Sequence, residues 1–332
     1  MKAFVDAVHS TGMKFILWYS VPFVGKHSKA WNRFKGKFLD SEENEYCVLD
    51  PRYNEVRDYL IDTYENAVKE WGIDGFKLDF IDSFRMTEFS NKYNSEMDTE
   101  QLEDAIEKLL SDVLKKLRDV NPDILIEFRQ NYTGPLMQTY GNMLRASDCP
   151  LDALTNRTKT LDLRMMSGCG VVHSDMLMWD KSGSTENAAR QITNVLFSVP
   201  QISVKLNDIP AEHMEMLKFY LSFCDRYRDV LLEGSLHVYQ PEMLYSMAYA
   251  QKGNRAVAVD FSGVVWNIES GIDEAVYVNA AQKDALYINA ENIDGTYDIL
   301  NCRGKIIEKG TLLRNTLKKF NVPVSGMIII RR

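Results

Sequence analysis

A short apolar strand that ends in carboxylates, within residues 72–82, constrains the fold of this chain most. Gly72 follows a helical run, and only glycine takes the left-handed conformation that ends a helix without steric cost. Residues 75–80 then form a predicted buried strand, whose period of two places Lys77 and Asp79 on one face. Burying a cation and an anion together is costly unless they are paired or used. The two charges therefore form either a structural ion pair or a catalytic carboxylate that the lysine keeps ionised.

Strands of continuous apolar character recur along the chain, at residues 13–19 and 124–129 among others. Such strands are typical of parallel sheets covered on both faces. Helices are predicted between them, including one that Asp50 caps and Pro51 begins and one over residues 211–232. Polar residues repeatedly lie at the strand ends, as Asp175 does in the predicted strand 171–175, which is typical of the active-site face of (β/α)8 barrels. About six units predict a partial barrel that lacks two N-terminal strands. A doubly wound open sheet is the competing fold, but it calls for a glycine-rich phosphate loop, which this sequence lacks.

The pattern changes beyond Gly234, where short strands follow one another with turn residues between them and no helix. At least six strands at a spacing of ~8–12 residues predict an antiparallel β-sandwich. We therefore expect two domains: a catalytic barrel over residues 1–234 and an all-β domain over residues 235–332.

Composition and motifs exclude several classes of function. A net charge of −8 and a pI of 5.3 argue against nucleic acid as a partner, and no apolar run reaches the ~20 residues of a membrane span. The sequence contains no zinc or calcium motif, and we expect neither a metal nor another cofactor. It also contains no nucleophile-elbow motif, which argues against Ser-His-Asp catalysis. Five scattered cysteines, without a CxxC pair, indicate reduced thiols; they are Cys47, Cys149, Cys169, Cys224 and Cys302.

The first residues carry no signal-peptide pattern, and residues 2–9 are already helical in pattern. A chain that opens within a helix is expected to be a piece of a longer protein, and the missing signal favours a cytoplasmic location. A barrel that lacks two strands leaves unpaired strand edges, so we also expect a homo-oligomer in which another copy covers them.

Two aspartates at predicted strand ends, Asp79 and Asp148, are the strongest candidates for catalysis. Strand ends of a closed barrel converge on one cavity, and a carboxylate pair that flanks the scissile bond is what glycoside hydrolysis requires. One carboxylate must be ionised and the other must hold a proton. Many barrels also place acids there to bind a metal, so the pair alone is moderately specific.

Aromatic and basic residues near the strand ends favour a sugar substrate, because sugar faces stack on rings while hydroxyl groups bind charged side chains. Trp18 and Trp179 fit a stacking role and a core role about equally well. His173 is slightly better explained as a satisfied core histidine than as a substrate contact. The remaining candidates for sugar contact are Lys77, Asp82, Arg129 and Arg145.

Several of these segments resemble one enzyme family. Residues 77–79 (Lys-Leu-Asp) resemble the Lys-Trp-Asp nucleophile motif of glycoside hydrolase family 36, the α-galactosidases, and its clan relatives. Residues 145–148 (Arg-Ala-Ser-Asp) resemble the Arg-x-Ser-Asp motif that carries the acid/base of that clan. Residues 12–18 look like its third strand, and the runs 48–59 and 220–234 are similar to flanking segments. The resemblance covers roughly residues 1–234, and the sandwich fits the C-terminal domain of the family.

The resemblance implies retaining hydrolysis of a terminal α-D-galactoside. Asp79 would attack the anomeric carbon, and Asp148 would protonate the leaving oxygen and then deprotonate water. Lys77, Trp18 and Arg145 would hold the sugar. The asparagine that the family carries two residues after its nucleophile is Ile81 here, which leaves Asp82 either to contact the sugar or to cap the next segment.

Three functions follow from these observations. The first is an α-galactosidase, and the second is a galactosyl transferase of the raffinose-synthase type on the same scaffold. The third is a carbohydrate-binding barrel fragment without catalysis. For the 332 residues alone we expect weak or no activity, because a gap in the barrel disorders the pocket.

Overall fold

The computed structural model describes residues 1–129, 131–168 and 170–332. The chain divides into two compact units, residues 1–144 and 145–332, and each unit has its own apolar core. This division does not coincide with the domain boundary expected near residue 234, which stays a prediction. The two units are described separately below.

A six-stranded sheet with parallel strands carries the α/β part of the chain. The chain passes from the first unit to the second within β6. The predicted parallel α/β fold is confirmed. In the described part of the chain, β1 and β8 are the edge strands of the sheet. Self-association through these edges stays a prediction. The strand order is β1 (Ile16–Ser20), β4 (Gly75–Asp79), β5 (Leu125–Arg129), β6 (Met143–Arg145), β7 (Val171–Leu177) and β8 (Val199–Ile202).

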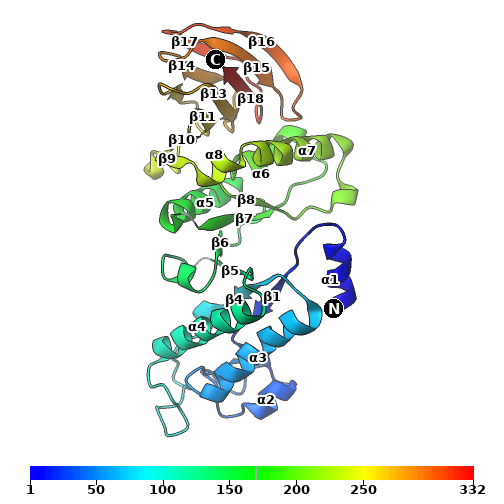
Figure 1. The fold of residues 1–332 in the computed structure, drawn as a ribbon, viewed down its shortest axis with the longest axis vertical. Helices are drawn as coiled ribbons and strands as arrows, with labels where there is room; N and C mark the ends of the chain where they lie inside the picture. Colours follow the sequence, from blue (N-terminus) through cyan, green and yellow to red (C-terminus); the bar gives the residue numbers. More distant parts are fainter. Residues whose placement is uncertain (130, 169) are drawn as a thin grey trace. The chain divides into compact units, whose positions relative to one another are not determined.

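Two long amphipathic helices, α3 (Asn54–Trp71) and α4 (Leu102–Val120), pack against each other and the strands of the first unit (Figure 1). Gly72 ends α3 in the left-handed conformation at φ 68°, as predicted. A short helix, α1 (Lys2–His9), precedes β1 and contacts α3.

The predicted start of α3 was wrong. Asp50 and Pro51 were expected to cap and begin the helix, but α3 begins at Asn54. The Asp50 carboxylate instead accepts hydrogen bonds from the backbone N–H and the guanidinium of Arg52, with Nη2 at 2.7 Å. Both side chains are buried, and the local ion pair holds residues 50–53 in a turn rather than a helix.

The long loop after β1 contains a hairpin of β2 (Phe23–Gly25) and β3 (Tyr46–Val48), with the short helix α2 (Lys29–Arg33) between its strands. The rings of Trp31 and Phe38 pack 4.7 Å apart and are buried, so the hairpin is anchored in the core of the first unit.

The second unit contains four α-helices in its described residues before its all-β part begins. The sequence patterns did not predict α5, and the single helix expected over residues 211–232 is broken at Tyr227, whose hydroxyl donates to Glu274 (2.9 Å). The helices are α5 (Ala153–Ser167), α6 (Thr185–Thr193), α7 (Ala211–Arg226) and α8 (Arg228–Glu233).

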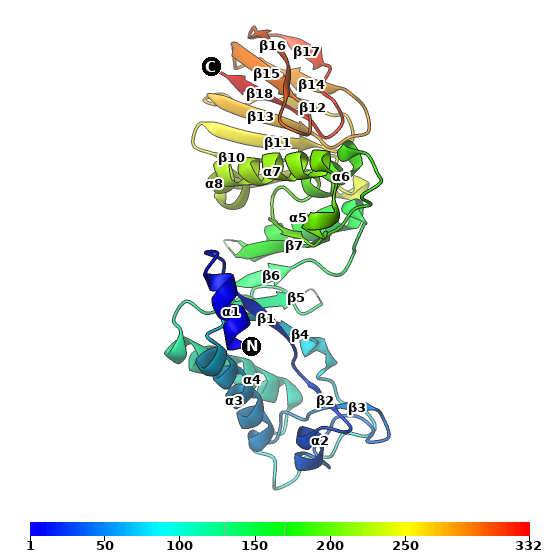
Figure 2. The ribbon, with the colours of Figure 1, turned by 90° about the vertical axis from the view of Figure 1, so that its right-hand side faces the viewer.

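The all-β part forms two facing sheets, as predicted. Most of its pairs are antiparallel, although β11–β13 and β12–β14 are parallel. The seven-stranded sheet packs on the smaller sheet through one face and on α7 and α8 through the other (Figure 2). Its order is β16 (Ile306–Leu312), β15 (Gly295–Leu300), β18 (Met327–Arg331), β13 (Glu274–Asn279), β11 (Arg255–Asp260), β10 (Met247–Lys252) and β9 (Ser235–Tyr239); the smaller sheet contains β12 (Val265–Asn267), β14 (Leu286–Asn289) and β17 (Leu317–Phe320).

Within the described ranges, no helix combines the length and the apolar character that crossing a membrane requires. Four of the five cysteines are free thiols in the structure. The fifth, Cys169, lies outside the described residues, as does Gln130.

Gly75, the first residue of β4, lies where the backbones of β4 and β5 approach each other closely. A Cβ added at Gly75 would lie 2.1 Å from the carbonyl oxygen of Leu125, whereas one added at Gly25 in β2 has no neighbour within 4 Å. We expect Gly75→Ala to lower the free energy of unfolding by about 1–3 kcal/mol, since backbone must shift to admit the methyl group. Urea denaturation of Gly75→Ala and of the control variant Gly25→Ala measures the free energy of unfolding of each. Equal stability of Gly75→Ala and Gly25→Ala would contradict this packing.

Candidate active site

Asp79 is the last residue of β4, at the carboxyl end of a strand that lies between β1 and β5. The parallel register places Asp79 beside Ser20 and Lys77 beside both Trp18 and Glu127. The side chain of Asp79 is buried, so its charge must be compensated by nearby groups.

Three hydrogen-bond donors from different parts of the first unit reach the Asp79 carboxylate. The indole N–H of Trp18 donates to Oδ2 at 2.9 Å, and the backbone N–H of Phe80 donates to Oδ1 at 2.9 Å. The hydroxyl of Tyr132 lies 3.3 Å from Oδ1 and 3.2 Å from the carbonyl oxygen of Leu78.

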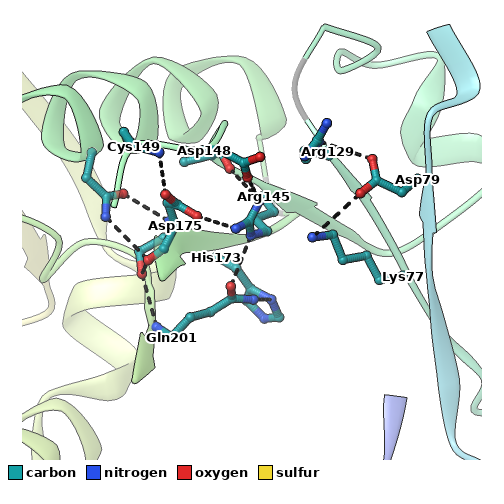
Figure 3. A network of polar contacts seen from close by, with 12 residues as sticks. Lys77, Asp79, Arg129, Arg145, Asp148, Cys149, His173, Asp175 and Gln201 are labelled. Atoms are coloured by element: carbon teal, nitrogen blue, oxygen red, sulfur yellow. Dashed lines mark hydrogen bonds and ion pairs between the residues drawn. The ribbon is translucent and has the colours of Figure 1, made fainter. Parts of the chain in front are cut away.

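Two cations complete the surroundings of Asp79 (Figure 3). Arg129 Nε lies 3.1 Å from Oδ1, and Lys77 Nζ lies 3.9 Å from Oδ2. The predicted pairing of Lys77 with Asp79 is therefore present, but Arg129 is the closer partner. The Asp79 carboxylate is thus surrounded by three hydrogen-bond donors and two cations, which together compensate a buried negative charge.

Tyr132 follows β5 and provides a neutral donor. Burial, and then the nearby charge of Asp79, raise the pKa of the Tyr132 phenol well above its usual range. The phenol therefore keeps its proton at physiological pH and can donate to Asp79. Sequence patterns did not identify Tyr132 as part of this cluster, because its role depends on the fold of the loop after β5.

The chain turns sharply after Asp79. Phe80 has a left-handed backbone (φ 63°, ψ 26°), a conformation that costs a non-glycine residue about 1–3 kcal/mol. This turn leads into the short 3₁₀ helix Ile81–Ser83 and leaves Asp82 exposed. The amide of Asn131 donates to Asp82 Oδ2 at 3.3 Å, while the predicted sugar contact of Asp82 stays a prediction.

Arg145, at the end of β6, organises a polar cluster in the second unit. Its guanidinium donates from Nε to Gln201 Oε1 (3.1 Å) and from Nη1 to Asp148 Oδ1 (3.0 Å). Nη2 forms a hydrogen-bonded ion pair with the buried Asp175 (Figure 3). One guanidinium therefore pairs with two carboxylates, Asp148 and Asp175, while the predicted sugar contact of Arg145 stays a prediction.

Asp175 was missed as a site residue by the sequence analysis. It lies in β7, and its side chain is completely buried. Its second oxygen accepts the backbone N–H of Cys149, while its own backbone N–H donates to Asn156 Oδ1 at 3.0 Å. A signal was available in the sequence, because Asp175 ends the predicted strand 171–175 as Asp79 and Asp148 end theirs.

Asp148 follows β6 and differs from Asp79 in exposure, since 53% of its side-chain surface is accessible to solvent. The neighbouring Cys149 is buried. Burial, and then the charge of Asp175, raise the pKa of the Cys149 thiol to about 12, which leaves it protonated and unreactive near neutral pH.

Two further sequence candidates lie in the second unit. The ring of His173 is within 3.3 Å of the amide of Gln201, which connects it to the Arg145 cluster. Trp179 packs against the apolar core, with its ring centroid 6.5 Å from that of His213. Sugar contacts by His173 and Trp179 stay predictions.

Metal binding finds no support among the described residues, where no group of three or more histidine, cysteine, aspartate or glutamate side chains is arranged to hold an ion. Each unit offers one candidate carboxylate, and the surroundings of the two differ. Asp79 is buried among donors, whereas Asp148 is half exposed and shares its cation.

No family model matches this sequence, and no curated protein matches it. Among solved structures, the fold is similar to the glycoside hydrolase family 36 α-galactosidase AgaA from Geobacillus stearothermophilus, with a TM-score of 0.67 and 16% identity over 99% of this chain. The α-galactosidase from Lactobacillus brevis matches all of this chain with a TM-score of 0.66 and 16% identity. The chain spans 46% of the length of each of these two proteins.

The similarity extends beyond the α-galactosidases. The match to an α-amylase from Anoxybacillus covers 99% of this chain and 78% of the amylase chain, with a TM-score of 0.61 and 13% identity. Variants of AgaA have been solved in complex with raffinose and with stachyose. At these identities the likeness shows a shared fold, which agrees with the family that the sequence motifs indicate.

The buried ion pair of Arg145 and Asp175 gives a stability prediction. Asp175→Asn leaves a buried guanidinium without this partner and should lower the free energy of unfolding by about 3–5 kcal/mol. Asp208→Asn, which removes an exposed ion pair with Lys205 in the same unit, should cost at most about 1 kcal/mol. Thermal unfolding at pH 7 compares the two variants, and similar midpoints would show that the buried pair is not needed.

Proposed function

We propose that this protein is a retaining α-glycoside hydrolase, with a terminal α-D-galactoside as the favoured substrate. The observation that carries the proposal is Asp79, a buried carboxylate at the end of a parallel strand, which three hydrogen-bond donors and two cations surround. A nucleophile of this class must be rigidly held close to groups that stabilise negative charge, and the hydrogen bonds and cations around Asp79 support that role.

Asp79 is the proposed nucleophile. Its carboxylate attacks the anomeric carbon, the bond to the leaving oxygen breaks, and a covalent glycosyl-aspartate forms. The Trp18 N–H and Tyr132 O–H fix the orientation of the carboxylate through hydrogen bonds at 2.9 and 3.3 Å. Fixed donors of this kind leave little reorganisation to be done when the bond forms.

Asp148 is the proposed acid/base. It shares the guanidinium of Arg145 with the buried Asp175. When Asp148 takes a proton, Arg145 and Asp175 still form a balanced pair, so the cluster tolerates both protonation states of the exposed carboxyl. Asp148 can therefore protonate the leaving oxygen in the first step and accept a proton from water in the second.

The architecture supports the same proposal at a coarser level. We interpret the six parallel strands as six of the eight strands of a (β/α)8 barrel, and the solved structures of similar fold are glycoside hydrolases. Preference for α-galactosides rests on the motifs at residues 77–79 and 145–148 and on the α-galactosidases among these neighbours. The residues proposed to contact the sugar are Lys77, Trp18, Arg145, Asp82, His173, Trp179 and Arg129.

A galactosyl transferase would use the same two carboxylates and differ only in the acceptor, so product analysis with an acceptor sugar separates it from a hydrolase. A non-catalytic carbohydrate-binding role would leave sugar binding without turnover. The activity screen should therefore measure binding of α-galactosides together with their hydrolysis.

Azide rescue assigns the two carboxylates separately. With a dinitrophenyl α-galactoside, Asp79→Ala should reduce kcat by roughly 10³-fold or more, because no covalent intermediate forms. Azide should restore turnover and yield β-galactosyl azide, since it attacks from the side that Asp79 has vacated. Asp148→Ala should slow deglycosylation by about 10²–10⁴-fold and yield α-galactosyl azide. Product stereochemistry is read by NMR.

Asp62→Ala is the matched control, because Asp62 is an exposed aspartate of α3 in the same unit as Asp79. It should leave kcat unchanged. Full activity of Asp79→Ala, or the same azide anomer from both active-site variants, would overturn the assignment.

A further inference from the structure

Arg157, on helix α5 of the second unit, is a buried cation whose described partners are all neutral. Its side chain is 8% exposed. The guanidinium donates to Asn194 Oδ1 at 3.2 Å and to the carbonyl oxygen of Leu244 at 2.9 Å, and its carbon atom lies 4.1 Å from the centroid of the Phe261 ring. Neutral acceptors and a ring share a buried charge but do not cancel it.

A second guanidinium, that of Arg190 on α6, lies close to the first. Asn194 connects the two arginines, because its Oδ1 accepts from Arg157 and its Nδ2 donates to the carbonyl oxygen of Arg190 at 2.8 Å. Burial, and then the charge of Arg190, lower the pKa of Arg157 to about 10, so Arg157 still carries its charge at pH 7. Two cations therefore lie together on neighbouring helices.

The acidic residues of these two helices do not compensate the two charges. Asp162, the acidic residue within α5, accepts the hydroxyl of Tyr245, and Glu186, the acidic residue within α6, has its carboxylate 3.9 Å from a cysteine sulfur. Within the described ranges, neither arginine forms an ion pair, and the Nε of each is buried without a hydrogen-bond partner. Unused donors and uncompensated charge thus occur at the same place.

The turn that supplies the Leu244 carbonyl to Arg157 is strained. Gln240, Leu244 and Tyr245 have left-handed backbones, with φ of 53°, 56° and 65°, which residues other than glycine rarely adopt. Two side chains of α5 hold this turn, Arg157 through the Leu244 carbonyl and Asp162 through the Tyr245 hydroxyl. Strain of this kind persists where the surrounding structure enforces it, and it is frequent at ligand sites.

The pair of arginines can be reached from solvent at Arg190. Arg190 is partly exposed, and its guanidinium faces the amide of Gln282, whose oxygen lies 2.9 Å from Nη1 in the orientation that satisfies both groups. Gln282 is itself exposed. A ligand that binds more strongly than a neutral amide can therefore take its place at Arg190.

We propose that Arg157 and Arg190 form a binding site for a phosphate group, either free or carried by a small metabolite. The planar guanidinium matches the oxygens of a phosphate through paired N–H donors. Two guanidinium charges also suit a group that carries a charge of about −1.5 to −2 at pH 7, as phosphate esters do. The site lies in the second unit and uses none of the residues proposed for catalysis.

Thermal unfolding of the 332-residue chain at pH 7 tests the site, with phosphate increased while sodium chloride keeps the ionic strength constant. The unfolding midpoint should rise and then saturate, since a ligand that binds the folded state stabilises it. Arg190→Gln should raise the half-saturating concentration about tenfold or more, and Arg157→Met should act in the same direction. A parallel titration with glycerol 2-phosphate shows whether phosphate esters bind as free phosphate does; binding of either ligand supports the site.

Arg228→Gln is the matched control, because Arg228 is an exposed arginine of α8 in the same unit and its loss changes the net charge equally. Its half-saturating concentration should equal that of the unmodified chain. Phosphate also stabilises proteins through exclusion from their surface, but that effect does not depend on one arginine.

Three results would overturn the inference. The first is a midpoint that rises without saturating, and the second is the same phosphate dependence in Arg190→Gln and Arg228→Gln. The third is an Arg157→Met variant that unfolds at a lower temperature yet keeps the full phosphate response, because Arg157 would then serve only to hold the strained turn. None of these results depends on the catalytic assignment, which the azide experiment tests separately.

Discussion

A buried carboxylate needs compensation, and in this protein the compensation of Asp79 fixes much of the first unit. Its three hydrogen-bond donors and two cations come from β1, β4 and β5 and from the segments that follow β4 and β5. Removing any one strand from register would leave the carboxylate with fewer donors at a cost of several kcal/mol. The parallel pairing of β1, β4 and β5 and the orientation of the Asp79 side chain therefore depend on each other.

In the second unit, the buried charge that needs compensation is the guanidinium of Arg145. There a buried cation is compensated by Asp175, and a second carboxylate, Asp148, is held half exposed beside it. Carboxylates in such different surroundings suit different roles, one as a fixed anion and the other as a group that exchanges a proton. The proposed division between nucleophile and acid/base follows from this contrast in burial and in the sharing of cations.

Local sequence patterns predicted much of the fold but only part of the site. Gly72 and the apolar strands were found because helix stops and continuous apolar runs are local signals. Helix α5 was missed because it buries polar side chains, among them Asn156, Arg157 and Thr160, which obscure its apolar period. Lys77 and Asp79 were paired by strand period alone. Tyr132, Asp175 and the orientation of the Trp18 N–H were not predicted, since they depend on contacts between residues distant in sequence.

Trapping of the covalent intermediate tests the central claim most directly. A fluorinated α-galactosyl fluoride reacts with a retaining enzyme to give a glycosyl-enzyme that hydrolyses slowly enough to be digested and sequenced by mass spectrometry. The account predicts a single added fluorogalactosyl group, carried by the peptide that contains Asp79 and located on its carboxylate. An adduct on any other residue, or turnover of the reagent without an adduct, would contradict it.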